Sequence, residues 1–181
     1  MTYIAALDAT AADSKTAATL DAVKARLGMV PNLYATLAKA PAALDALLAI
    51  NAAISGGGLN AKEREIVALA TSQANRCQYC LSAHTLLGKN AGLSVKETEL
   101  ARAGNGSDGR AAAIAQLTKA LIEERGHIAL AALDDFRAAG LSESDLLEIA
   151  VNVAATTLTN YVNNLARTEI DFPVVKPQLA A

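Results

Sequence analysis

The sequence predicts an all-α protein built as one helical bundle of about seven to nine helices. Alanine makes up roughly a quarter of the 181 residues, only four residues are proline, and apolar residues recur every three to four positions almost throughout. No segment shows the alternating pattern of a strand. With 52% hydrophobic and 19% charged residues, the chain can bury a sizeable core. Its length fits a single domain over residues 1–181.

Three helices are expected before residue 60. The first begins after an N-cap at Asp13 and stops at Gly28. Pro31 and Pro41 begin two more, because proline fits the first turn of a helix. The run Gly56–Gly58 ends the third helix in a hinge or a sharp corner, since glycine leaves the backbone free to turn. The apolar positions on these helices are Leu20, Val23, Leu27, Leu44, Leu47, Leu48 and Ile50.

Capping residues predict three further helices in the middle of the chain. Asn60 with Glu63 three positions later resembles a capping box. A second helix starts at residue 76 or 77 and ends at Gly92, and a short third helix occupies Ser94–Ala103. The apolar stripe behind the capping box consists of Ile66, Val67, Leu69 and Ala70.

The loop-like run Gly104–Gly109 separates a first half, residues 1–104, from a second helical unit, residues 110–181. The second unit is expected to hold helices over Ala111–Arg125, Ile128–Ala139 and Ser142–Arg167, followed by an extended tail at Asp171–Pro173.

The two halves of the chain share a weak internal sequence repeat. Leu59–Glu63 opens an apolar helix, and Leu141–Asp145 opens another 82 residues later. This spacing fits two duplicated helical units, and it also fits a chance likeness of two capped helices. When the two segments are aligned, Thr159, Val162 and Ala166 of the second segment correspond to Cys77, Cys80 and His84 of the first. The chemistry is therefore expected in the first half.

Composition excludes several classes of function. The net charge is −2, tryptophan is absent and aromatics make up 3%, a balance that argues against binding nucleic acid or an anionic membrane surface. No apolar stretch is long enough to span a bilayer, and Met1–Thr10 lacks the basic start of a secretory signal, so we expect a cytoplasmic protein. The two cysteines lie within four residues of each other, unlike the cysteines of a disulfide scaffold.

Cys77, Cys80 and His84 form the constellation that points to chemistry. On a helix the two cysteines lie roughly 60° apart, and Cys80 and His84 roughly 40° apart, so all three share one face. Residues three apart are close enough for a disulfide after a modest local adjustment. The pair is therefore able to cycle between dithiol and disulfide.

A route to thiol activation is visible in the same segment. Both cysteines fall in the expected first turn of a helix, where free N–H groups and the positive dipole end favour a thiolate. His84 is placed to act as a base toward Cys80, directly or through a water, if a third group orients its ring. Glu65 is the candidate third group, and Glu63 is its competitor, although capping already explains Glu63.

Other interpretations remain open at this point. Cys77, Cys80 and His84 are also ligand types for zinc, with His127, Glu65 or a neighbouring subunit as a fourth ligand. The pair also fits a general thiol–disulfide oxidoreductase or redox sensor, or a structural helical assembly protein. His127 is expected to be a surface or capping residue, and Tyr79 either a core residue or a proton-relay hydroxyl. The asparagines Asn160, Asn163 and Asn164 are expected to satisfy buried backbone groups or a subunit contact.

Glu65 followed by the Cys77-x-x-Cys80-x-x-x-His84 motif resembles the signature of the alkylhydroperoxidase AhpD-like branch of the carboxymuconolactone decarboxylase superfamily. The stretches Leu27–Asn32 and Thr168–Pro173 resemble its peroxidase-related subgroup. The resemblance covers most of the chain. It implies an AhpD-like helical fold, cytoplasmic homo-oligomers (trimers or hexamers) and reduction of hydroperoxides without haem, flavin or metal.

The resemblance also implies a role for each site residue. Cys80 corresponds to the peroxidatic thiol, Cys77 to the resolving thiol, and His84 with Glu65 to the proton relay. The implied substrates are organic hydroperoxides or hydrogen peroxide, and the implied reductant is a dithiol of the lipoyl or thioredoxin type. Well-studied members carry a second histidine between the cysteines, where this sequence has Tyr79. The decarboxylase branch lacks the cysteine pair, so its lactone chemistry is not the expected inheritance.

Overall fold

Nine α-helices and one short 3-10 turn, Ala9–Ala11, make up the regular structure of residues 1–178, the part of the chain that this computed structural model describes. No strand occurs within these residues, which confirms the prediction of an all-α fold. The helices are α1 (Ser14–Leu27), α2 (Asn32–Leu37), α3 (Pro41–Ser55), α4 (Ala61–Ala74), α5 (Gln78–Asn90), α6 (Val95–Arg102), α7 (Gly109–Glu123), α8 (Leu130–Ala138) and α9 (Glu143–Ala166).

The predicted caps form as expected. Asp13 accepts from the Thr16 N–H and begins α1, and Gly28 ends that helix in the left-handed conformation at φ 80°. Capping boxes begin α4, α6 and α9. Helix α7 starts two residues earlier than predicted because Asp108 caps it, accepting from the Ala111 N–H. The 3-10 turn was not predicted, and Asp8 stabilises it by accepting from Thr10.

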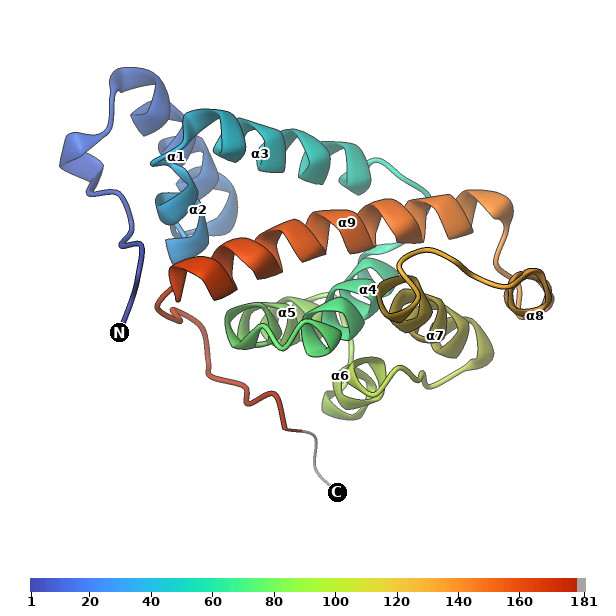
Figure 1. Ribbon diagram of the computed structural model, residues 1–181. Coiled ribbons are helices and arrows are strands. Elements are labelled where there is room, and N and C mark those ends of the chain that lie inside the picture. Colours follow the sequence, from blue (N-terminus) through green and yellow to red (C-terminus); the bar gives the residue numbers. More distant parts are fainter. Residues whose placement is uncertain (179–181) are drawn as a thin grey trace.

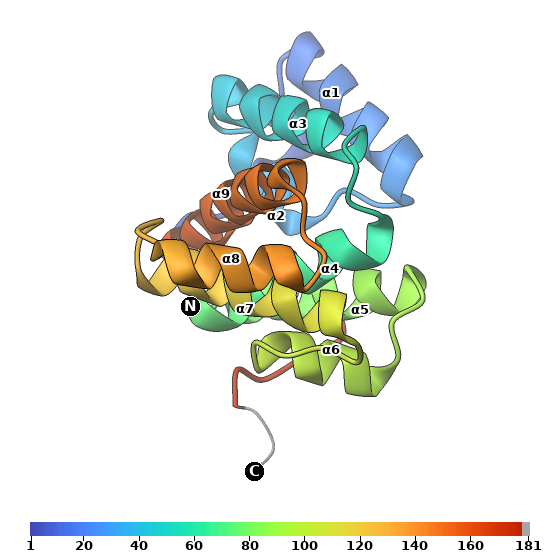
Figure 2. The same cartoon turned by 90° about the vertical axis from the view of Figure 1, so that its right-hand side faces the viewer.

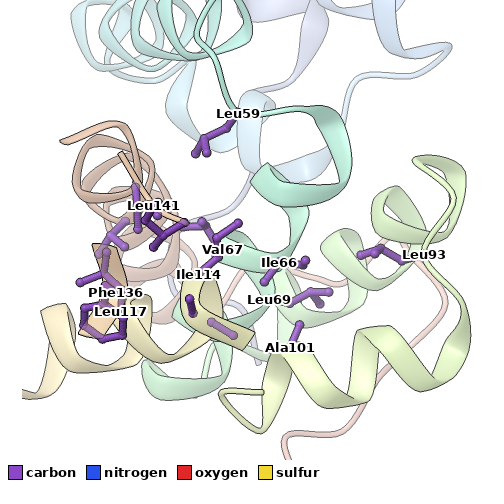
Figure 3. Close-up of a cluster of buried hydrophobic side chains, with 14 residues drawn as sticks. Leu59, Ile66, Val67, Leu69, Leu93, Ala101, Ile114, Leu117, Phe136 and Leu141 are labelled. Atoms are coloured by element: carbon purple, nitrogen blue, oxygen red, sulfur yellow. The ribbon is translucent and has the colours of Figure 1, made fainter. Parts of the chain in front are cut away.

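Helix α9 runs through the middle of the molecule, with α1 to α3 on one side and α4 to α8 on the other (Figures 1 and 2). Two hydrophobic clusters follow this division. Figure 3 shows the cluster between α4, α7, α8 and α9, which includes Val67, Ile114 and Phe136. The second cluster joins leucines of α1, α2 and α3 to Cys77 and Cys80. The cysteine pair therefore lies where the N-terminal helices pack against the rest of the bundle.

The two segments of the predicted internal repeat begin at the capping boxes of α4 and α9, which lie close together in the structure. Arg110 of α7 binds the carboxylate of Glu63 at 2.6 Å and that of Asp145 at 2.9 Å. Leu59 and Leu141, which precede the two boxes, are both buried. The second copy differs from the first in being one uninterrupted helix, whereas the first is divided into α4 and α5. Duplication of the two units stays a prediction.

The glycine run after α3 forms a fixed corner. The carboxylate of Glu148 accepts from the Gly58 N–H at 2.8 Å and from the Leu59 N–H at 3.1 Å. A Cβ on Gly57 would lie 2.6 Å from the same carboxylate, so only glycine fits without displacement. This contact ties the start of α4 to α9.

Arg110→Ala is expected to lower the free energy of unfolding by about 1–2 kcal/mol, because it removes charge-assisted bonds to two capping carboxylates and to the Gly140 carbonyl. Urea unfolding followed by circular dichroism measures this. Lys15→Ala is the control, since its pair with Asp45 is exposed and its loss is expected to cost under about 0.5 kcal/mol. Equal losses in both variants would contradict the bridging role of Arg110.

Candidate active site

The turn between α4 and α5 sets the position of the first cysteine. Arg76 adopts a left-handed conformation at φ 51°, which is uncommon for a residue other than glycine. The Cys77 N–H then donates to the Ser72 carbonyl at 2.9 Å. Helix α5 begins at Gln78, so Cys77 is its N-cap and only Cys80 lies in its first turn. The expectation that both cysteines lie in that turn is therefore wrong, because the turn after α4 includes the left-handed Arg76 and leaves Cys77 as the N-cap of α5.

The two thiols are close together and differ in what they face. Cys77 is 0% exposed and Cys80 is 2% exposed. The Cys80 N–H donates to the Cys77 sulfur at 3.4 Å, which is the capping interaction of α5. Cys80 lines a cavity of about 490 Å³, whereas Cys77 is not among the residues that line it. A molecule in the cavity therefore meets Cys80 first, with Cys77 directly behind it.

His84 and Glu65 form the pair that the sequence suggested. His84 Nδ1 lies 2.9 Å from Glu65 Oε2, across the interface between α5 and α4. Both side chains are largely buried and both line the same cavity as Cys80. Burial alone lowers the pKa of His84, but the charge and hydrogen bond of Glu65, together with the Cys80 sulfur, raise it above its ordinary value. Glu63 instead caps α4 and binds Arg110, so it does not take this place.

Helix α9 supplies a contact to Cys80 that sequence reasoning missed. The Asn163 Nδ2 donates to the Cys80 sulfur at 3.2 Å, and the Thr159 hydroxyl lies 4.0 Å from it. Asn160 bonds to the side chains of Ser72 and Asn75, and not to the buried backbone groups that the sequence suggested. The chemistry is thus not confined to the first half of the chain. The available signal was the pair Asn160 and Asn163, about one turn apart on the buried face of α9.

The surroundings place the negative charge on Cys80. Burial opposes its ionisation, but the hydrogen bond from the Cys77 thiol, the charge of His84 and the Asn163 and Asn160 amides together lower its pKa to about 6. The pKa of Cys77 is raised far above its usual range, because its thiol bonds to Cys80 and is itself buried. Cys80 is therefore the thiolate of the pair near neutral pH.

Alkylation of Cys80 by iodoacetamide is expected to accelerate as pH rises through about 6 and to level off near neutrality. The reason is that a lowered pKa keeps the thiolate above that pH and loses it below, whereas an ordinary cysteine titrates near pH 8.5. Peptide mass spectrometry of the reduced protein after timed labelling from about pH 4 to pH 9 follows the reaction. A midpoint near 8.5 would contradict this assignment.

The cavity beside Cys80 has mostly apolar walls from α1, α3 and α5. Tyr79 closes one side: its hydroxyl accepts from the Leu33 N–H at 3.2 Å, and its ring meets Phe172 edge-on at 5.6 Å. Burial raises the pKa of Tyr79. Tyr79, which stands where the resemblance places a second histidine, thus accepts a hydrogen bond from the first turn of α2. The apolar lining residues include Val23, Leu27, Met29, Leu48, Ile54, Ala68, Ala83, Leu86, Leu87 and Phe172.

His127 is exposed on the loop before α8, where its N–H donates to the Glu124 carbonyl, as expected for a surface residue. Among residues 1–178, no group of three or more histidine, cysteine or acidic side chains is arranged to hold a metal ion. None of the helices described is both long and apolar enough to cross a bilayer.

The middle of the chain matches a known family. Residues 41–123 match the family model described as "Carboxymuconolactone decarboxylase family", and this range contains Glu65, Cys77, Cys80 and His84. No curated protein matches the chain. This match confirms the family resemblance for residues 41–123, the range that holds the site.

Solved structures share the fold over nearly the whole chain. The alkylhydroperoxidase AhpD core of an uncharacterized peroxidase-related protein from Ralstonia eutropha JMP134 is 23% identical with a TM-score of 0.85, over 94% of this chain and 92% of that one. An uncharacterized peroxidase-related protein from Silicibacter sp. TM1040 is 23% identical with a TM-score of 0.81, over 92% and 91%. The debrominase Bmp8, in complex with 2,3,4-tribromopyrrole, is 18% identical with a TM-score of 0.78, over 94% and 92%. The fold is AhpD-like.

Proposed function

We propose that this protein, which carries a carboxymuconolactone decarboxylase family region within an AhpD-like fold, reduces organic hydroperoxides through a Cys77/Cys80 dithiol–disulfide cycle. The observation that carries the proposal is the arrangement at the cavity wall. A thiol with lowered pKa, Cys80, faces a cavity that is also lined by the bonded pair His84 and Glu65. A nucleophile, a proton donor and a space for substrate thus meet at one place.

In the first step the Cys80 thiolate attacks the terminal oxygen of the hydroperoxide. The sulfur–oxygen bond forms as the oxygen–oxygen bond breaks, which gives Cys80 sulfenic acid and an alkoxide. The alkoxide takes a proton from the His84 imidazolium and leaves as the alcohol. Glu65 stabilises the imidazolium before the transfer and holds the ring in place through Nδ1.

In the second step the Cys77 thiol attacks the Cys80 sulfur, and the sulfenic oxygen leaves as water. The product is a Cys77–Cys80 disulfide, which a dithiol reductant of the lipoyl or thioredoxin type reduces by exchange. Cys77 is suited to resolving because it already lies against Cys80 and keeps its proton until the sulfenic acid forms.

The apolar cavity walls favour a hydroperoxide with a hydrocarbon body over hydrogen peroxide. We therefore expect cumene hydroperoxide to oxidise the reduced, metal-free protein faster than hydrogen peroxide does, at one equivalent per chain. Intact mass should fall by two hydrogens as both free thiols disappear. Oxidation no faster than that of an ordinary thiol would contradict the proposal and favour a redox sensor. One metal per chain, removed by chelation together with the fold, would favour a metal-binding protein instead.

The structural similarity to Bmp8 favours a second candidate, reductive dehalogenation of a small halogenated ring. The same dithiol would supply the two electrons: the Cys80 sulfur takes the bromine, the ring carbon takes a proton, and Cys77 displaces bromide to form the disulfide. Bromide release from 2,3,4-tribromopyrrole by the reduced protein tests this candidate. Release at the rate of a free thiol such as dithiothreitol would eliminate it.

A further inference from the structure

The cavity beside Cys80 also has a polar end, which the proposed reaction does not use. This end lies where α1, α3 and α5 end and where α4 begins. Figure 2 shows these helix ends on the same side of the molecule, at the right of the view. The polar end is defined by five residues that all line the cavity, Arg26, Asn51, Ser55, Arg64 and Asn90.

Arg64 is held at the polar end by the chain itself. Its side chain is half-buried, and its Nη1 donates to the carbonyl of Leu59, a buried residue shortly before α4. A guanidinium has five N–H donors, so one bond to a carbonyl leaves the others for a ligand. Because the bond to Leu59 restrains the side chain, less freedom is lost when a ligand binds there.

No acidic side chain of residues 1–178 forms an ion pair with Arg64 or Arg26. Two acidic residues line the same cavity, but Glu65 binds the imidazole of the site at 2.9 Å and Asp171 accepts from the first N–H of α2 at 2.7 Å. Glu148 uses its carboxylate on the backbone N–H groups before α4. Two cations without a counter-charge therefore face an otherwise apolar cavity, which favours an anionic group on the ligand.

The separation of Arg64 from Cys80 sets the length of a ligand that contacts both. A Cβ on Gly88 would lie 3.7 Å from the Cβ of Glu65, so this level of α4 faces Gly88 on α5. Gly88 is eight residues beyond Cys80, roughly 12 Å along the helix axis. The Arg64 side chain extends toward Leu59 at the start of α4, which is the end away from Cys80. The guanidinium is therefore roughly 10–15 Å from the thiol.

We propose that Arg64, assisted by the exposed Arg26, binds the carboxylate of a long-chain hydroperoxy acid whose peroxide group reaches Cys80. This inference rests on the proposed function and adds the substrate class. In that class the carboxyl carbon and the peroxide-bearing carbon are separated by roughly eight to twelve bonds, at about 1.2 Å per bond of an extended chain. The guanidinium pairs with the two carboxylate oxygens through parallel N–H donors, and the apolar walls contact the hydrocarbon between the two ends.

The role of Arg64 is to position the substrate, and it does not touch the reacting atoms. A substrate fixed at its carboxylate end and along its hydrocarbon has few orientations left for the peroxide group, which raises the rate of attack by Cys80. A hydroperoxide without the carboxylate still enters the apolar part of the cavity, but it lacks this restraint. The preference for an acid over its ester is therefore the property that Arg64 controls.

Stopped-flow oxidation of the reduced protein by 9-hydroperoxyoctadecadienoic acid and by its methyl ester tests this preference. The ester keeps the peroxide and the hydrocarbon and lacks the negative charge. Below saturation, the acid is expected to react about 10- to 100-fold faster than the ester in the wild type, and Arg64→Met is expected to bring the ratio close to one. The ratio within one variant cancels any general loss of reactivity. If both compounds oxidise the wild type rapidly and equally, the carboxylate subsite is refuted and the peroxidase proposal stands.

Arg102→Met is the matched control. Arg102 is also half-buried, donates to a backbone carbonyl and forms no ion pair within residues 1–178, but it does not line the cavity. This variant is expected to keep the wild-type ratio. Arg64→Lys should retain part of the preference, because lysine keeps the charge and loses the paired donors. An equal drop in the ratio for Arg102→Met and Arg64→Met would overturn the assignment to Arg64.

Binding of dodecanoate, which has no peroxide group, tests the subsite without the chemistry. In calorimetry with the reduced full chain, Arg64→Met is expected to weaken dodecanoate binding by about 10-fold or more and to leave dodecanol binding nearly unchanged. Dodecanoate should also protect Cys80 of the wild type from iodoacetamide. This result, together with hydroperoxides that react no faster than with a free thiol, would support the subsite and refute the proposed function. No dodecanoate binding, or binding that does not depend on Arg64, would refute the subsite.

Discussion

Cys80→Ser is expected to abolish the peroxide-driven loss of thiols, lowering the rate constant by at least about 10³-fold. Serine keeps the size of the side chain, but its hydroxyl is not ionised near neutral pH and does not act as a nucleophile there. The remaining thiol, Cys77, is fully buried, has a raised pKa and does not line the cavity. Stopped-flow reaction of the reduced protein with cumene hydroperoxide measures the effect.

Cys77→Ser provides the matched control within the same pair. It should still react once per chain, leaving a sulfenic acid at Cys80 that dimedone traps as a single adduct. Without the resolving thiol, it should show no turnover with a dithiol that cannot itself enter the cavity. Loss of the first oxidation in Cys77→Ser, with its retention in Cys80→Ser, would reverse the two roles.

Glu65→Gln is expected to slow the peroxide reaction at pH 7 by about 10- to 100-fold and to move the titration of Cys80 upward. Without the carboxylate, burial dominates at His84 and the pKa of the imidazole falls. A neutral imidazole no longer lowers the pKa of Cys80 and offers no acidic proton to the leaving alkoxide. The pH profile of the rate constant, in the variant and the wild type, separates these effects from a loss of folding.

Glu63→Gln is the control for the relay. Its carboxylate caps α4 and binds Arg110 on another side of the helix, so its loss should affect stability and leave the pH profile unchanged. Equal profiles for Glu65→Gln and the wild type would show that the bond between His84 and Glu65 serves structure alone.

The positions of the helices were predictable because their ends are decided locally. Asp13, Asn60, Ser94 and Ser142 each accept from the backbone N–H three residues later. The exceptions are also local in origin. Helix α5 starts at Gln78, one or two residues later than predicted, after Arg76 adopts a left-handed conformation that residue type does not predict.

The candidate site was predictable only where its parts share a helix or adjoining helices. Cys77, Cys80 and His84 are close in sequence, and Glu65 lies on the preceding helix, so spacing alone suggested the group. Asn163 was not identified as a contact of Cys80, because it is 83 residues away on α9. Sequence periodicity gives the face of a helix on which a residue lies, but it does not give what that face meets.

By itself the sequence determined an all-α chain, its capped helices and a reactive Cys-x-x-Cys with a histidine one turn later. The tertiary structure decided which thiol faces the cavity and which amide from α9 supports it. The physical reason is the range of the interactions involved. Helix caps and helical spacing act within a few residues, whereas burial, the pKa of a thiol and the shape of a cavity depend on packing between segments far apart in the chain.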